Sequence, residues 1–343
     1  MASDLTQLII IVLIILAIGL AFSIGANDET LSALVGTGAL KFKLALIIGG
    51  IAIGSGMILT SGGFVAKTVG SDILGKGLTY TTSMLLTVLI SSIIWLVIGS
   101  FAGIPLSSTH SLVGSVVGVV IVYSLTQEVV SLENAFNWEK LGSVILSWFF
   151  SPFFGFVITY LLFRILAKFY LSRLKGLNQI ERAERSFKWL LLITIIFAEI
   201  WVGANSGEAL GILYGLLGNG SLEIQEYFFY AVICGIFAFL GIYIAARFVI
   251  RNLASQMTDS RPSEGLIIQT SSALILMIAT LFGLPISHSH VIVFCIIGMN
   301  IAQKKEVEYK SIGKMGIFWV LTFPIAALLA GIIYYSFSMI SFI

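Results

Sequence analysis

The sequence predicts an all-α, polytopic membrane protein made of two inverted-topology repeats, with about 10–12 transmembrane segments, some of them broken or re-entrant. Three observations lead to this fold class. Hydrophobic residues make up 58% of the 343-residue chain and charged residues only 10%, which is more apolar surface than a water-soluble core can bury. Two polar motifs recur in the same order, about 180 residues apart. Lysine and arginine gather in alternate connecting segments, as in multi-pass membrane proteins.

Ten apolar stretches are long enough to span a bilayer, which takes roughly 20 helical residues. The first, fifth, sixth and last are longer than that and contain Gly-Ala-Asn or a proline, so we expect them to be broken or to include re-entrant pieces. The first follows Asp4 rather than a basic segment and is too long for a signal peptide, so we expect a retained span. The stretches cover residues 5–38, 43–62, 80–101, 105–124, 138–168, 188–217, 226–247, 264–282, 285–303 and 314–340.

The positive charges predict the orientation in the membrane. If the N-terminus lies outside, every lysine and arginine except Lys67, Lys76 and Lys140 falls on the inner side, in agreement with the positive-inside rule. We therefore expect a multi-pass protein of the cell membrane, with both termini outside.

The most polar connector, residues 172–188, divides the chain into two halves. We expect it to be a charged cytoplasmic linker between a first membrane repeat, residues 1–171, and a second, residues 189–343. Each half then holds five crossings, and an odd number makes the second repeat enter the membrane from the opposite side. The repeats are therefore predicted to be inverted.

The first repeated motif is Gly-Ala-Asn, at residues 25–27 and again at 203–205. A helix broken there exposes free carbonyls, which suit a hard monovalent cation together with an Asn amide oxygen and a carboxylate. One carboxylate follows each break, where its charge is costly unless it faces a cavity or a cation. A carboxylate alone could instead carry a proton. For Glu29 and Glu199 the alternative is a position at a helix end, where the side chain reaches the membrane interface. We expect a coupling-cation site formed by Asn27, Asp28, Asn205 and Glu208.

The second repeated motif is a Pro-x-Ser-x-x-His turn, at residues 105–110 and 285–290. Proline fits the first turn of a helix, where free N–H groups and hydroxyls lie at the positive end of the helix dipole. Such an end binds an oxyanion without a basic side chain, and two of them can converge on one tetrahedral anion. The alternative is ordinary N-capping, in which Ser107 or Ser287 only satisfies backbone donors.

Several function classes are excluded or disfavoured. A net charge of +2 is too small to indicate a nucleic-acid partner. Two of the histidines, His288 and His290, are two residues apart and so lie on different helix faces, which disfavours a zinc site with His110. Cys234 and Cys295 stand in apolar segments and are predicted to be core filler. An intramembrane enzyme would need a metal or acid–base constellation on one helix face, and none is present, so we expect neither an enzyme nor a cofactor.

In these motifs the chain resembles the inorganic phosphate transporter (PiT) family, in order and over almost its whole length. The matching segments are residues 25–28 running to 36–40, 105–110, 147–152, 203–205, 283–287 and 319–324. The resemblance implies an inverted-repeat carrier of inorganic phosphate in the lipid bilayer, coupled to a sodium ion or a proton and often a homodimer; related bacterial members carry sulfate. It also implies an anion site formed by Asn27, Ser107, Ser108, Thr109, Asn205, Ser206, Ser287, His288 and Ser289.

The chain departs from the family pattern near both motifs. Residues 29–31 are Glu-Thr-Leu where Val-Ala-Asn is usual, Ser206 replaces an aspartate, and His288 and Ser289 stand where two threonines are usual. Monohydrogen phosphate has a proton that a carboxylate can accept, whereas sulfate has none, so a carboxylate in contact with the anion favours phosphate. A sulfate or other oxyanion permease of the same fold is the alternative. A passive channel fits less well, because carboxylates beside an anion-binding turn suit a carrier that neutralises the charge of its substrate before moving it.

Overall fold

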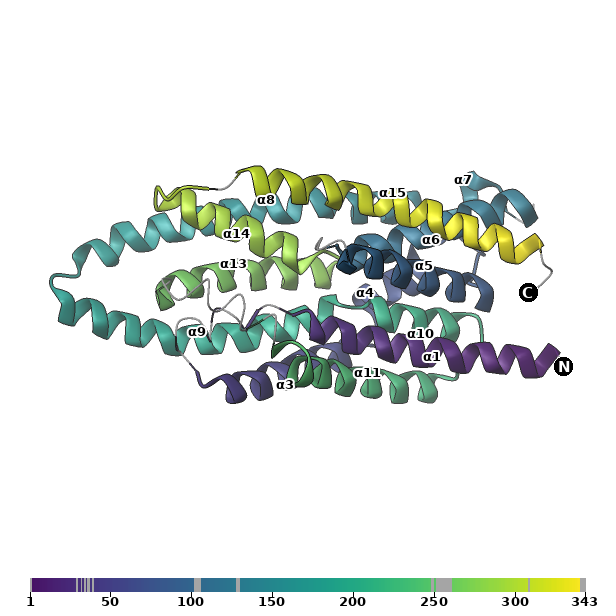
Figure 1. Ribbon diagram of the computed structural model, residues 1–343, viewed down its shortest axis with the longest axis horizontal. Helices are drawn as coiled ribbons and strands as arrows, with labels where there is room; N and C mark the ends of the chain where they lie inside the picture. The colour runs from purple at the N-terminus through teal and green to yellow at the C-terminus, as the bar shows by residue number, and fades with distance from the viewer. Residues whose placement is uncertain are drawn as a thin grey trace.

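The described part of the fold consists mainly of long apolar helices (Figure 1). The computed structural model of the chain describes residues 2–28, 30–31, 33, 35, 38, 40–101, 106–127, 130–247, 250, 261–307 and 309–339. Its α-helices are α1 (Ala2–Ala26), α3 (Phe42–Leu59), α4 (Phe64–Lys67), α5 (Thr82–Phe101), α6 (Ser108–Gln127), α7 (Leu132–Ala135), α8 (Trp138–Phe169), α9 (Leu177–Asn205), α10 (Glu208–Gly218), α11 (Ile224–Ile244), α13 (Pro262–Leu281), α14 (His288–Ala302) and α15 (Tyr309–Met339). A π-helical turn, η1 (Thr68–Asp72), and a 3-10 turn, η2 (Leu171–Arg173), complete the described elements.

Eight helical segments of the described residues are long and apolar enough to cross a membrane, with α9 and α10 together forming one of them. Two shorter apolar helices, Thr82–Ile98 within α5 and the whole of α14, bring the set into one-to-one correspondence with the apolar stretches of the sequence. The predicted all-α, multi-pass membrane fold is therefore confirmed.

The first and sixth apolar stretches are broken at the Gly-Ala-Asn motifs, as predicted. α1 ends at Ala26, and α9 ends at Asn205 just before α10 begins. The glycine of each motif lies directly against a neighbouring backbone. A Cβ on Gly25 or Gly203 would stand 2.0 Å from a carbonyl oxygen of α11 or α3, respectively. Each motif thus combines a helix break with close packing against a second helix.

The expectation that the fifth and last stretches are broken is wrong. α8 and α15 run without interruption through Pro152 and Pro324. A proline removes one backbone hydrogen bond and disturbs the turn before it, but in membrane proteins neighbouring helices compensate for this loss. Here α8 packs along α14, and α15 packs along α6, so both prolines lie in supported helices.

Much of the connector at residues 172–188 is helical. η2 follows α8, and α9 begins already at Leu177. Glu181 and Glu184 each precede a basic residue, Arg185 or Lys188, by four positions, a spacing that supports helix formation. α9 therefore begins as a charged, mostly exposed helix before it reaches its apolar part.

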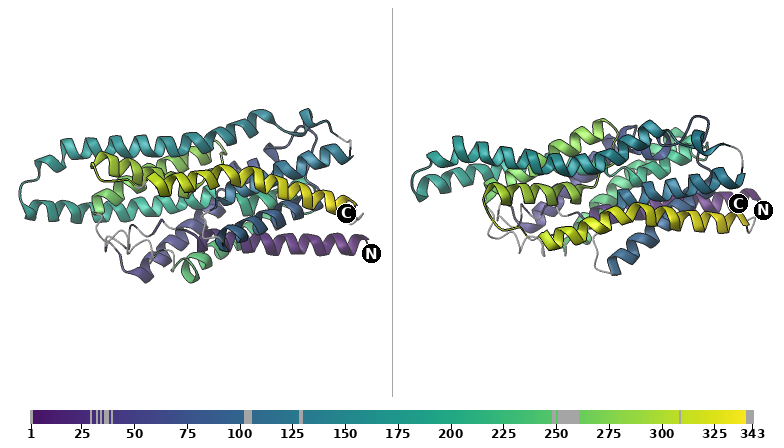
Figure 2. Two further views of the ribbon diagram at one scale, coloured as in Figure 1. Left: turned by 45° about the horizontal axis from the view of Figure 1, so that its top comes forward. Right: turned by 90° about the horizontal axis from the view of Figure 1, so that it is seen from above.

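The helices form an elongated bundle with both chain ends at one end and the turn between α8 and α9 at the other (Figure 1). α5 and α6 occupy the half near the termini, whereas α13 and α14 occupy the half near the α8–α9 turn. The views in Figure 2 keep this arrangement. The N-termini of α6 and α14 therefore face the middle of the bundle from opposite halves.

Helices at corresponding positions of the two chain halves make corresponding contacts. α1 packs against α11, and α9 packs against α3; likewise α6 packs against α15, and α14 packs against α8. One pair departs from this pattern, because α13 lies along α9 much more closely than α5 lies along α1. The looser contact between α1 and α5 leaves space for a cavity between these two helices.

Candidate substrate and ion site

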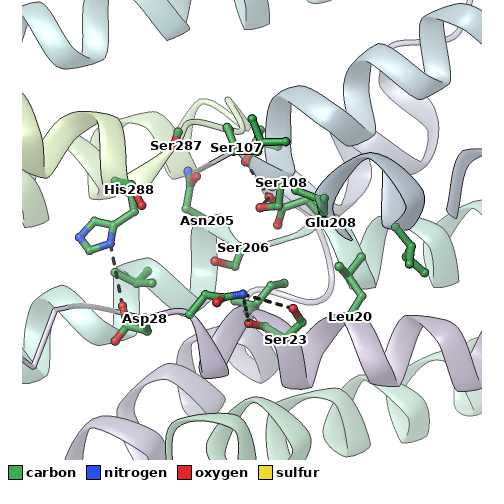
Figure 3. A pocket seen from close by; sticks show the side chains of 18 of the residues that line it. Leu20, Ser23, Asp28, Ser107, Ser108, Asn205, Ser206, Glu208, Ser287 and His288 are labelled. Atoms are coloured by element: carbon green, nitrogen blue, oxygen red, sulfur yellow. Dashed lines mark hydrogen bonds and ion pairs between the residues drawn. The ribbon is translucent and has the colours of Figure 1, made fainter. Parts of the chain in front are cut away.

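A cavity of about 880 Å³ lies where the two helix breaks meet the N-termini of α6 and α14 (Figure 3). Every residue that the sequence predicts for the anion or the coupling cation lines this cavity: Asn27, Asp28, Ser107, Ser108, Thr109, Asn205, Ser206, Glu208, Ser287, His288 and Ser289. The fold thus brings together residues from both halves of the chain. Which ligand each of them binds stays a prediction.

Glu208 connects the start of α10 to the start of α6 (Figure 3). Its side chain is buried, and Oε1 accepts hydrogen bonds from Thr109 Oγ1 at 2.6 Å and from Ser108 Oγ at 3.2 Å. Oε2 is also buried and has no hydrogen-bond partner among the described residues. A carboxylate oxygen left unsatisfied away from water is unfavourable, so the arrangement leaves room for a cation or a proton at Oε2.

Asp28 forms a second carboxylate site on the opposite side of the cavity (Figure 3). Its Oδ1 accepts a hydrogen bond from Thr30 Oγ1 at 2.8 Å and lies 3.9 Å from His288 Nδ1. Its Oδ2 is buried without a hydrogen-bond partner in the described part of the chain. Gln269 of α13 donates from Nε2 to the backbone carbonyl of Thr30 at 3.2 Å, which ties this site to the second half of the chain.

The two motif asparagines make different hydrogen bonds. Asn205 Nδ2 donates to Thr280 Oγ1 at 2.9 Å and to the carbonyl of Leu284 at 3.0 Å, and Asn205 Oδ1 accepts from the N–H of Ile286 at 3.0 Å. Its amide is therefore engaged by the turn between α13 and α14. Asn27 Nδ2 instead donates back to its own helix, to the carbonyl and hydroxyl of Ser23 at 3.0 and 3.3 Å.

The two turn serines also differ. Ser107 Oγ accepts from the N–H of His110 at 3.3 Å and lies 2.7 Å from His110 Nδ1, so the capping role holds for this residue. Ser287 precedes α14 but makes no side-chain capping bond. Its hydroxyl lines the cavity, which leaves it available to a ligand there.

Behind the site, His110 and His290 pack against aromatic side chains in the core. His110 packs on Trp148 with ring centroids 3.9 Å apart, and His290 packs on Trp319 at 3.8 Å. The two histidine rings lie 4.9 Å from each other. No group of three or more His, Cys, Asp or Glu side chains in the described ranges is arranged to hold a metal ion.

The rest of the cavity is an apolar cleft between α1 and α5. Its walls are Ile15, Leu16, Gly19 and Leu20 of α1 and Ile93, Leu96 and Val97 of α5. Because α1 runs from the terminal end of the bundle toward the centre (Figure 1), this cleft extends from the polar site toward that end. On the opposite side, Leu191, Ile195 and Ala198 of α9 are fully buried, where α9 packs along α13.

Two parts of the sequence prediction lie outside the described residues, namely Glu29 and the Gly-Ile-Pro segment 103–105. Glu199 is buried within α9 and does not line the cavity. The sequence interpretation missed Thr30 and Gln269, which support Asp28. Neither belongs to a repeated motif, although Thr30 follows the first one closely and Gln269 begins a polar run, residues 269–272, within an apolar stretch.

The chain is similar to known proteins over nearly its whole length. The phosphate transporter family matches residues 24–330. A protein from Pyrococcus furiosus named as a phosphate permease is 27% identical, with 97% of each chain covered. One from Bacillus subtilis named as a low-affinity inorganic phosphate transporter is 26% identical, over 98% of this chain and 99% of its own. A solved structure titled the sodium-dependent phosphate transporter superposes with a TM-score of 0.81 at 22% identity, covering 97% of this chain and 99% of that one. These proteins are transporters and not enzymes, and the match over nearly the whole sequence means that the chain belongs to the phosphate transporter family.

Proposed function

We propose that this protein is a secondary active symporter that carries inorganic phosphate across the cell membrane together with sodium ions or protons. The observation that carries the proposal is the cavity in which two hydroxyl-bearing helix N-termini meet two buried carboxylates. The names of the relatives, phosphate permease and inorganic phosphate transporter, support phosphate as the substrate. The name of the similar structure, a sodium-dependent phosphate transporter, supports sodium as the coupling ion.

In this proposal the anion lies between the start of α6 and the start of α14. Free N–H groups and the positive ends of two helix dipoles attract it, and the serine and threonine hydroxyls donate hydrogen bonds. Glu208 lies beside Ser108 and Thr109. If one of its oxygens contacts the anion directly, phosphate is favoured over sulfate, because the carboxylate can accept the proton of monohydrogen phosphate. A sulfate permease is the second candidate, and it requires a cation to shield Glu208 from the anion.

The coupling cations bind at the two carboxylates. Asp28 and Glu208 each have one buried oxygen without a hydrogen-bond partner in the described ranges, and a bound cation removes the cost of that arrangement. The Oδ1 atom of Asn27 is a further oxygen ligand at the break after α1. Asn205 acts mainly by holding the turn between α13 and α14, since its amide already bonds there.

Transport proceeds by alternating access between two inverted repeats, residues 1–171 and 189–343. The exchange of helix contacts between the halves supports inverted repeats, since α1 pairs with α11 as α9 pairs with α3. The open cleft between α1 and α5, opposite the packed pair of α9 and α13, corresponds to one of the two access states. The charge distribution favours termini outside, a cytoplasmic connector at 172–188 and hence an outward-open cleft. A homodimer stays a prediction from the family resemblance.

Uptake by purified protein in liposomes tests the proposal. Labelled phosphate and labelled sulfate are each offered under an imposed sodium gradient and then under a proton gradient, with empty liposomes as the control. Phosphate uptake driven by either gradient is the expected result, and the effective gradient identifies the coupling ion. Sulfate uptake without phosphate uptake would show that sulfate is the substrate. Phosphate flux that is the same with and without either gradient would indicate a channel.

A further inference from the structure

The turn between α13 and α14 has an unusual set of hydrogen bonds on its backbone carbonyls. Four successive carbonyls, from Phe282 to Pro285, each accept a hydrogen bond from a side chain of another element. Lys140 Nζ donates to Phe282 at 2.9 Å, and Thr68 Oγ1 donates to Gly283 at 2.6 Å. The donors to Leu284 and Pro285 are Asn205 Nδ2 at 3.0 Å and Trp148 Nε1 at 2.9 Å. Side chains of η1, α8 and α9 thus hold one short segment.

The N–H groups of the same turn are bonded as well. Gly283 N–H donates to the carbonyl of Thr280, and Leu284 N–H donates to that of Ala279, each at 2.8 Å. This is the pattern of a Schellman motif, which ends α13. Pro285 has no N–H, and Ile286 N–H donates to Asn205 Oδ1. Because these backbone groups are all bonded, the path of the chain into α14 is fixed.

Gly283 is required where two of the donors meet. Its φ of +62° lies in the left-handed region that favours glycine. A Cβ there would stand 2.8 Å from Thr68 Oγ1 and 3.2 Å from Lys140 Nζ. Any other residue would therefore strain the turn and displace both side chains.

We propose that Thr68, Lys140 and Trp148 are positioning residues for the transported anion. They fix the turn so that α14 begins with its N-terminus and Ser287 on the cavity. The proposal rests on the assignment of α14 to the anion site in the proposed function. None of the three lines the cavity, so each acts through the turn and not by contact with the anion.

Three features favour this role over ordinary structural support. The donors are all directed at the segment that leads into α14, one of the two helices whose N-termini line the anion site. Lys140 places a positive charge at the C-terminus of α13, where it stabilises the helix end, and it does so from the start of α8, far away in the sequence. The Thr68 hydroxyl is 3.2 Å from the carbonyl of Phe64, one turn earlier in the chain, but its hydrogen bond to the carbonyl of Gly283 is shorter. Thr68 lies in a π-helical turn, a feature frequent at functional sites.

The test is a set of double-mutant cycles read by equilibrium binding of labelled phosphate to purified protein at saturating sodium. Thr68→Val and Lys140→Met each remove one donor and are expected to weaken phosphate binding about three- to tenfold. Thr68→Ser keeps the hydroxyl and should bind as the wild type does. The matched control is Thr126→Val, which removes a hydroxyl that bonds only within α6 and should leave binding unchanged.

The cycles separate positioning from general stability. Thr68→Val combined with Ser287→Ala should cost less than the two single effects together, because both act on the same turn. Thr68→Val combined with Ser107→Ala, at the other turn, should be additive. Unchanged phosphate affinity in Thr68→Val, or additive effects in both cycles, would overturn the proposal even if thermal stability falls. Lys140→Met provides the same comparison if Thr68→Val does not fold.

The wild-type measurement distinguishes this inference from the proposed function. Wild-type protein that binds labelled sulfate and not phosphate overturns the phosphate assignment, and the same cycles are then read with sulfate. Wild-type protein that binds neither anion overturns the proposed function and the positioning role together. Phosphate binding with additive cycles overturns only the positioning role.

Discussion

Glu208→Gln should produce a protein that is more stable in the absence of sodium and no longer stabilised by sodium. Glu208 is 3% exposed, and its Oε2 has no hydrogen-bond partner in the described part of the chain. An unsatisfied buried oxygen of a charged group costs about 1–3 kcal/mol or more. Glutamine keeps the size and can accept from Thr109, but carries no charge. The Nε2 group of the glutamine would still lie buried without a partner, so the gain comes only from removing the buried charge. The apo variant should therefore be more stable than the apo wild type by on the order of 1 kcal/mol.

The second expected signal is the sodium-dependent rise in Tm. A ligand at 100 times its Kd stabilises the folded state by about 2.7 kcal/mol, which for a chain of 343 residues corresponds to a rise in Tm on the order of 4 °C. The wild type should show this rise in sodium chloride relative to choline chloride at equal ionic strength. Glu208→Gln should show a reduced rise, because one cation site has lost its charge.

Thermal unfolding of purified protein in detergent measures both signals, with the exposed Glu133→Gln as the control. A variant that keeps the full sodium-dependent rise, or that is less stable than the wild type in choline, would refute the reasoning. A wild type whose Tm ignores sodium but follows pH would assign Glu208 to a proton.

Three further predictions concern the cavity. Asp28→Asn should abolish cation-driven uptake while the protein remains folded in the membrane, and normal driven uptake by this variant would remove Asp28 from the coupling site. Ser107→Ala with Ser287→Ala should weaken phosphate affinity about tenfold or more and sodium affinity less, as measured by binding; equal losses would argue against direct contact between the two hydroxyls and the anion. Cysteines at Leu20 and Leu96, on facing walls of the cleft, should crosslink more readily when phosphate and sodium are both present, since the cleft then closes. Crosslinking that ignores the ligands would argue against closure between α1 and α5, and the two native cysteines are buried and free.

The sequence could indicate which motif residues lie together because repetition distinguishes them from ordinary polar residues in a membrane helix. Asn27 and Ser107 recur as Asn205 and Ser287, and all four line one cavity, as the proposed inverted arrangement requires. The prolines at 152 and 324 recur in the same way, but their repetition reflects matching helix packing and not a break. A repeated proline alone does not tell these two cases apart.

The supporting residues could not be predicted from the sequence. Thr68 contacts Gly283 across more than half of the chain. In the sequence, Lys140 is only one of three basic residues on the predicted outer side. Their roles depend on how closely η1 and α8 approach the end of α13. Only tertiary packing sets that approach, so hydropathy, charge and motif spacing carry no signal for it.

In the proposed pair of inverted repeats, the two motif asparagines differ in a way that can hold one side open. Asn205 bonds to the turn after α13, and that side is packed; Asn27 bonds to its own helix, and the cleft lies open beside it. If the repeats exchange conformations during transport, Asn27 should release Ser23 and accept from the N–H of Leu106, as Asn205 accepts from Ile286. The hydrogen bonds gained on one side then match those lost on the other. Because the exchange conserves their number, it can proceed with a small difference in free energy, as a reversible carrier requires.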